Sequence, residues 1–197
     1  MRQFSLTNHK GDRLTILEHG ASMQSWSVAV GPERRELILG YANPQQYQQD
    51  NSYLGAVVGP YANRIGNGNL QLAGQHYQLQ LNEGKHHLHG GANGLHRQQW
   101  QLQQQTSSSV QLRCILPDGH SGYPGPTAFS VLYQLNADSS LDVTLSASAT
   151  QLTLAGPTLH PYFNLSGKAE PINQHQLWLN AEQYTPTDSD KIPTGQL

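Results

Sequence analysis

The chain has 197 residues, a mass of 21.7 kDa and a formal net charge of −2, which is enough polypeptide for one substantial domain. Its 11 Lys and Arg residues are scattered, so the clustered positive charge that nucleic acids require is missing, and we expect no nucleic-acid partner. No apolar run has the length of a membrane span or a signal peptide, so we expect no membrane association and a cytoplasmic protein.

Charged residues make up 12% of the chain, against about a quarter in an ordinary soluble domain. Asn, Gln, His and Tyr replace them, and this composition favours a surface that binds neutral polyhydroxy ligands. The single cysteine, Cys114, excludes an internal disulfide. Cys114 alternates in step with its apolar neighbours Val110, Leu112 and Leu116. We therefore expect it on the apolar face of a strand rather than as a reactive thiol.

Near the N-terminus, apolar residues alternate over 14–16 and 23–30, which predicts a pair of strands around Gly20. The arginine pair Arg34-Arg35 has a glutamate on each side and is predicted to form a solvated turn. The helical candidate is short and covers 43–50, where a proline at the second position suits a first helical turn.

Alternation then recurs over 70–81, 110–116, 129–135 and 141–147. Within the first of these runs, Ala73-Gly74 marks the turn of a hairpin. Glycine- and proline-rich turns separate the runs, and no internal repeat or linker is present. Many short strands joined in this way predict an all-β sandwich or barrel that forms a single domain over 1–197.

Two histidine-containing segments carry the candidate chemistry, His86-His87-Leu88-His89-Gly90-Gly91 and Leu159-His160-Pro161-Tyr162-Phe163-Asn164-Leu165. On a strand, His87 and His89 would share one face, as in some metal sites, but a third ligand at zinc spacing is missing, so we predict no metal. Phosphate-binding loops and nucleophilic serines also lack their sequence context. Acid–base chemistry by His160, with Tyr162 on the same side of an extended segment, remains, beside the alternative of a hydrogen-bonded core histidine.

Three segments together resemble the aldose 1-epimerase, or galactose mutarotase, family. Val58-Gly59-Pro60-Tyr61-Ala62-Asn63-Arg64-Ile65 is similar to its Asn-Arg-Ile segment, Leu88-His89-Gly90-Gly91 to its Leu-His-Gly-Gly element, and His160-Pro161-Tyr162-Phe163-Asn164-Leu165 to its His-x-Tyr-Phe-Asn-Leu element. Other matches are Pro117-Asp118-Gly119, Gly122-Tyr123-Pro124-Gly125, Tyr184-Thr185-Pro186 and Ile192-Pro193-Thr194-Gly195. Their order and spacing follow the family from Gly20 to Leu197.

The resemblance implies a large antiparallel β-sandwich that interconverts the α and β anomers of a free aldose, without a cofactor or metal. It implies that His160 donates a proton to the ring oxygen of the sugar and that His89 holds and polarises that side. Asn63 and Arg64 match substrate-binding positions, and Tyr162 lies beside the sugar by the same analogy. Charge repulsion from Arg64 would lower the pKa of His160 or His89.

The chain departs from the family pattern in two ways. Pro60 and His87 stand where many members have arginine and asparagine, which we expect to adjust substrate fit. None of the six glutamates lies in a segment like that of the family's base glutamate, so we expect a truncated domain with weak or no activity. Unpaired strand edges would then favour a homodimer. Two other functions stay open, a non-catalytic carbohydrate-binding module and an assembly partner that another chain completes.

Overall fold

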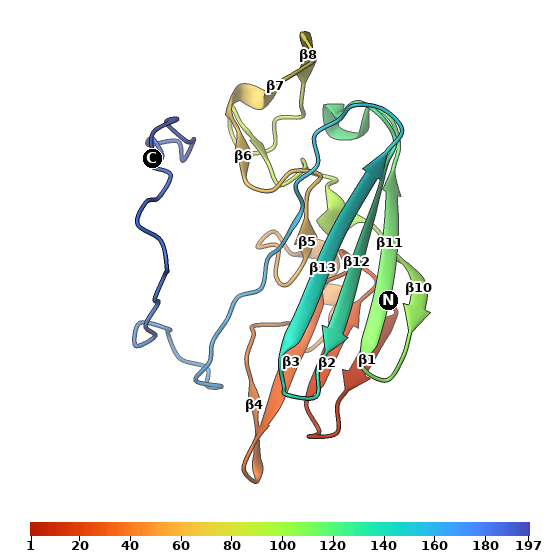
Figure 1. Cartoon of the computed structure of the whole chain (residues 1–197), viewed down its shortest axis with the longest axis vertical. Helices are drawn as coiled ribbons and strands as arrows, with labels where there is room; N and C mark the ends of the chain where they lie inside the picture. Colours follow the sequence, from red (N-terminus) through yellow and green to blue (C-terminus); the bar gives the residue numbers. More distant parts are fainter.

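In the computed structural model, which describes residues 1–197, two four-stranded antiparallel sheets lie face to face (Figure 1). The first sheet has the order β1-β2-β3-β4, with bounds Gln3–Thr7, Arg13–Leu17, Met23–Val30 and Glu33–Glu36. The second sheet has the order β10-β11-β12-β13, with bounds Gln101–Gln105, Ser109–Leu116, Thr127–Leu135 and Leu141–Ala149. The predicted antiparallel β-sandwich is thus confirmed.

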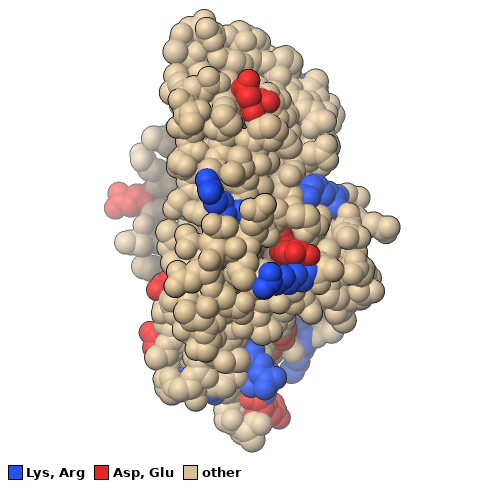
Figure 2. Space-filling model, turned by 90° about the vertical axis from the view of Figure 1, so that its right-hand side faces the viewer, with Lys and Arg blue, Asp and Glu red and all other residues tan.

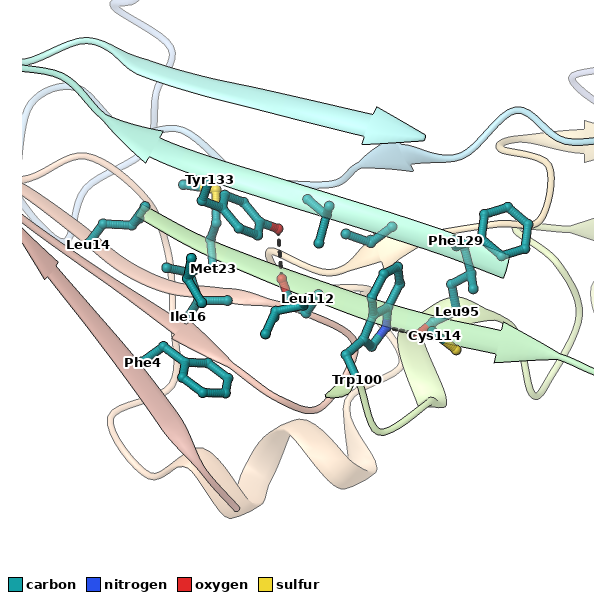
Figure 3. Close-up of a cluster of buried hydrophobic side chains, with 14 of the residues drawn as sticks. Phe4, Leu14, Ile16, Met23, Leu95, Trp100, Leu112, Cys114, Phe129 and Tyr133 are labelled. Atoms are coloured by element: carbon teal, nitrogen blue, oxygen red, sulfur yellow. Dashed lines mark hydrogen bonds between the residues drawn. The ribbon is translucent and has the colours of Figure 1, made fainter. Parts of the chain in front are cut away.

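The core fills the space between the two sheets and contains 18 buried residues (Figure 3). Alternate residues of β12 point into it, as the period-two pattern predicts: Phe129, Val131, Tyr133 and Leu135. Cys114 is buried on β11, the neighbouring strand of the same sheet, which confirms its place in the core. Two polar groups in the core are hydrogen-bonded: the Tyr133 hydroxyl donates to the Ala21 carbonyl (2.7 Å), and the Trp100 indole donates to the Leu95 carbonyl (3.2 Å). The buried indole N–H of Trp26, which packs against the core, has no partner.

The hairpin of β7 (Asn69–Leu72) and β8 (Gln75–Gln78) turns at Ala73 and Gly74, as predicted. Both turn residues have positive φ, 48° and 78°, the geometry that twists two strands correctly through a two-residue loop. The helical candidate is the 3₁₀ helix η1 (Pro44–Gln49), and the side chain of Asn43 caps it by accepting from the Gln45 N–H.

The prediction of a solvated turn at Arg34-Arg35 is wrong, because these residues belong to the edge strand β4, which pairs with β3. Gly31, with φ of 59°, lies in the connection between the two strands. Charged side chains on an exposed edge strand protect it from pairing with other chains, and this explains why a strand here has so polar a sequence.

Short ladders at one end of the sandwich hold together the loops that carry the histidines. β5 (Val57–Val58) pairs with β14 (Thr158–Leu159), and β6 (Arg64–Ile65) pairs with β9 (His87–Leu88). Three further 3₁₀ turns complete the connections: η2 (Gly66–Gly68), η3 (Leu95–Arg97) and η4 (His120–Gly122).

After β14 the chain runs outside the two sheets without forming another strand (Figure 1). Several of its apolar side chains lie in solvent, above all Leu177 and Trp178, which are 85% and 81% exposed. Charged side chains are sparse and mixed in sign on the face seen in Figure 2. No helix of the structure combines the length and apolar character that a bilayer crossing needs.

Candidate active site

Eleven residues line an open cleft of about 550 Å³ at the end of the sandwich: Asn51, Ser52, Tyr53, Ala62, Asn63, Arg64, Leu88, His89, Thr158, His160 and Tyr162. A volume of this size is typical of small-molecule sites. All five residues singled out from the sequence are among them, although three separate segments of the chain supply them.

The pairing of β6 with β9 brings Asn63 next to His89. The backbone N–H of Asn63 donates to Nδ1 of His89 (2.9 Å), and the N–H of His89 donates to the Asn63 carbonyl (3.1 Å). Because Nδ1 accepts a hydrogen bond, the proton of the neutral imidazole resides on Nε2. His89 is therefore oriented as a hydrogen-bond donor.

The backbone around the cleft is strained. Tyr53, Asn63 and His89 have φ of 58°, 66° and 52°, in the left-handed region that side chains other than glycine rarely adopt. Such outliers persist where surrounding bonds enforce them, and they gather at functional sites. The glycine after His89 is required, because a Cβ at Gly90 would lie 1.8 Å from the Gly59 carbonyl oxygen.

Arg64 is held by two neighbours. Its Nε and Nη2 donate to the two carboxylate oxygens of Glu83 (2.5 and 2.6 Å), and its Nη1 donates to Oδ1 of Asn63 (3.2 Å). The side chain is 14% exposed, so the guanidinium is largely fixed. This bidentate pairing holds the pKa of Glu83 below its ordinary value. A fixed cation with hydrogen-bond donors to spare can bind the hydroxyl groups of a sugar.

His160 follows directly after β14. Its backbone N–H donates to the Ala56 carbonyl (2.9 Å), and its carbonyl accepts the N–H of Gly55 (3.0 Å). Its ring lies 5.3 Å from that of His89 and 5.2 Å from that of Tyr162, between centroids. The Tyr162 hydroxyl donates to the Ser52 carbonyl (2.9 Å), which fixes this aromatic wall of the cleft. His160 thus lines the cleft, and the alternative of a core histidine is wrong.

Burial, and then the charges of His160 and Arg64, lower the pKa of His89 to about 4. The expected repulsion from Arg64 therefore contributes to the pKa of His89, but desolvation is the larger cause. His89 is neutral at pH 7 and keeps its Nε2–H for an acceptor in the cleft.

Two aromatic residues near the cleft were missed from the sequence, Tyr53 and His96. The Tyr53 ring lies 4.8 Å from His89, 4.7 Å from His96 and 5.8 Å from His160, between centroids. Burial, and then the charge of Arg97, lower the pKa of His96 to about 3. Neither residue belongs to a catalytic pattern, so no sequence signal pointed to them.

His87 does not share a face with His89, contrary to the expectation for a continuous strand. The positive φ of His89 ends the strand, and the two ring nitrogens of His87 bond the Gln80 carbonyl (2.7 Å) and the Tyr123 hydroxyl (2.8 Å). No group of three or more His, Cys, Asp or Glu side chains is arranged to hold a metal ion. The residues that line the cleft also include no carboxylate.

An antiparallel β-sandwich that carries two histidines and an arginine in one open cleft has close structural relatives. An aldose epimerase homologue from C. elegans superposes with a TM-score of 0.94 at 28% identity, covering 99% of this chain and 60% of that one. Galactose 1-epimerase from Lactobacillus acidophilus superposes with a TM-score of 0.74 at 30% identity, covering 83% of this chain and 48% of that one. The fold is therefore that of galactose mutarotases.

The family model described as aldose 1-epimerase matches residues 2–197. Aldose 1-epimerase from Haemophilus influenzae is 36% identical over 195 residues, which are 98% of this chain and 57% of that protein. Galactose mutarotase from Homo sapiens is 37% identical over 187 residues, 94% of this chain and 54% of that protein. The chain belongs to the aldose 1-epimerase family, and it spans a little over half the length of these relatives.

Proposed function

We propose that this protein acts on the anomeric centre of a free aldose such as galactose or glucose, and that its cleft supplies the acid half of an aldose 1-epimerase site. The observation that carries the proposal is the convergence of His160, His89 and Arg64 on one cleft. A monosaccharide fits this volume. The hydrogen-bond donors and the cation of the cleft suit its hydroxyl groups, and the aromatic faces suit its ring.

In the proposed reaction, the imidazolium of His160 gives its proton to the ring oxygen of the pyranose. The bond between C1 and this oxygen breaks while water or an added carboxylate takes the proton from the C1 hydroxyl, because the cleft itself holds no carboxylate, and the open aldehyde forms. Rotation about the C1–C2 bond and the reverse proton transfers close the other anomer. An acid that protonates a poor leaving group contributes about 10²–10⁴-fold.

The neighbours of His160 have binding and positioning roles in this proposal. His89 donates its Nε2–H to the ring-oxygen side, since the Asn63 N–H occupies Nδ1. Arg64 and Asn63 bind hydroxyl groups, and Tyr162 packs against the sugar. The lowered pKa of His89 supports this role, because a neutral imidazole donates without competing with His160 for the proton.

The absence of a carboxylate from the cleft favours a second candidate, sugar binding without catalysis. Chemical rescue separates the two. Mutarotation of fresh α-galactose is followed by polarimetry with and without added formate, which can serve as an external base. If His160 is an acid that lacks its partner, formate accelerates the reaction more with the native chain than with His160→Ala.

An equal rate with both chains at every formate concentration, together with saturable galactose binding, would support the binding module and contradict the acid role. Failure to bind any aldose, measured by calorimetry and by shifts of the His89 and His160 imidazole resonances, would contradict both functions. Fast mutarotation without formate that His160→Ala abolishes would confirm the acid and overturn the expectation of weak activity.

A further inference from the structure

A second cavity lies next to the sugar cleft and shares Arg64 with it. Its volume is about 340 Å³, and none of the eight residues that line it is apolar: Arg64, Glu83, Gly84, Lys85, His86, Ser189, Asp190 and Lys191. Three cations border it. One of the two carboxylates, that of Glu83, is already neutralised by the bidentate contact with Arg64. Because this contact also uses the charge of Arg64, the two lysines face the single carboxylate of Asp190, and the cavity is polar with a small excess of positive charge.

His86 presents an unsatisfied donor to this cavity. The residue is 8% exposed, and its Nδ1 accepts the backbone N–H of Asn67 (3.1 Å), which leaves the hydrogen on Nε2. Nε2 is buried and has no hydrogen-bond partner. A buried donor without an acceptor is costly in a folded protein, so a group that supplies an acceptor here would bind favourably.

The nearest acceptor belongs to a distant part of the chain. Asp190 lies in a turn over residues 186–194, which Asp188 stabilises by accepting the N–H groups of Asp190 and Ile192 (both 2.9 Å). The Asp190 carboxylate contacts the Lys85 ammonium (2.7 Å) but stops 3.6 Å from Nε2 of His86. The Asp190 carboxylate therefore bonds Lys85 but leaves the Nε2 donor of His86 without an acceptor.

We propose that this cavity binds the phosphate group of a phosphorylated aldose, while the sugar ring lies in the adjoining cleft. A tetrahedral oxyanion has enough oxygens to accept from Lys85, from Lys191 and from Nε2 of His86 at once, which Asp190 does not achieve. The contact that the ligand must displace is weak, because both of its side chains are well exposed, 66% for Lys85 and 43% for Asp190.

Arg64 connects the two sites, since it borders both the cleft and the second cavity. A ligand that spans them would place its ring hydroxyls and its anionic group on opposite sides of one fixed guanidinium. This proposal names the substrate class of the proposed function. The binding of the sugar ring rests on that function, whereas the binding of the anionic group does not.

Titration calorimetry of the whole chain with inorganic phosphate, galactose and galactose 6-phosphate tests the proposal. We expect galactose 6-phosphate to bind at least tenfold more tightly than galactose, and Lys85→Met to remove about that factor. Asp190→Asn removes the competing carboxylate and should strengthen phosphate binding about threefold. Lys10→Met removes an exposed lysine from a remote turn and serves as the matched control.

Resonances of the His86 imidazole should shift when inorganic phosphate is added. Equal affinities for galactose and galactose 6-phosphate, or a phosphate affinity that Lys85→Met and Lys10→Met change equally, would overturn the anion site. If inorganic phosphate and galactose 6-phosphate bind equally tightly and galactose does not bind, the anion site stands and the proposed sugar function fails. Binding of inorganic phosphate without binding of galactose 6-phosphate would overturn the charged aldose as the ligand of this cavity.

Discussion

The sandwich has a regular backbone of long paired strands, whereas the cleft has an irregular backbone of short ladders and loops. Strands β11 and β12 form eight consecutive antiparallel pairs, and their side chains alternate between core and surface. The ladders beside the cleft are two residues long, and three residues of its wall have left-handed backbone. Stability therefore resides in regular pairing and burial, whereas the arrangement of functional side chains depends on strained, individually held positions.

The sharpest way to break this comparison is to damage the core alone. Leu112→Ala removes a fully buried side chain and should lower the free energy of unfolding by about 2–5 kcal/mol. Urea denaturation followed by circular dichroism measures the loss. Leu132→Ala, on the adjacent strand but half exposed, is the control and should cost under about 1 kcal/mol. A change in sugar affinity per folded molecule of Leu112→Ala would contradict the separation of the two regions.

The converse change damages the cleft. If Arg64 binds the sugar as proposed, Arg64→Met should weaken galactose binding by tenfold or more, because a charged donor is lost. The pKa of Glu83 should rise towards its ordinary value when its partner is removed, which carbon-detected NMR titration measures. Arg113→Met, on an exposed position of β11, is the matched control and should leave both quantities unchanged.

Acid should weaken the cleft side of the molecule first. The folded-state pKa values of His89 and His96, about 4 and about 3, lie below the unfolded value near 6.5, so the unfolded chain binds more protons as the pH falls through this interval. Their contribution to stability is complete above about pH 6.5 and is lost as the pH falls to about 3, by up to about 1.4 kcal/mol for each histidine and each pH unit, so several kcal/mol in all.

Denaturation at a series of pH values measures this loss. His96→Asn should flatten the dependence, whereas His76→Asn, at an exposed position of β8, should not. The same slope in both variants would show that the buried imidazole is not its source.

The smallest effect is expected at Tyr53. Its hydroxyl makes no hydrogen bond, whereas its ring contacts three histidines, so Tyr53→Phe should change sugar affinity less than twofold. Tyr53→Leu loses the aromatic contacts, each worth about 0.5–1.5 kcal/mol, and should weaken binding several-fold. Equal sugar affinities of the two variants would show that the aromatic ring of Tyr53 does not contribute to sugar binding.

The sandwich was predictable because burial in antiparallel sheets imposes a period of two, which Phe129, Val131 and Tyr133 display directly. Arg64, His89 and His160 were predictable because each lies in a distinctive short segment. Tyr53 was not, because it reaches the histidines through a loop that the buried Asp50 holds by accepting the N–H groups of Ser52 and Leu54. Such tertiary bonds leave no local pattern, and the same holds for the meeting of Lys85 with Asp190.

The exposed indole of Trp178 makes the outer segment optically visible. Of the three tryptophans, Trp100 is sealed in the core at 2% exposure, while Trp178 is surrounded by water and should fluoresce at long wavelength. Any polypeptide that settles over this segment, a second copy of the chain included, would shift that emission to the blue while the signal of Trp100 stays constant. The emission wavelength of Trp178 can therefore report assembly of the chain without an added label.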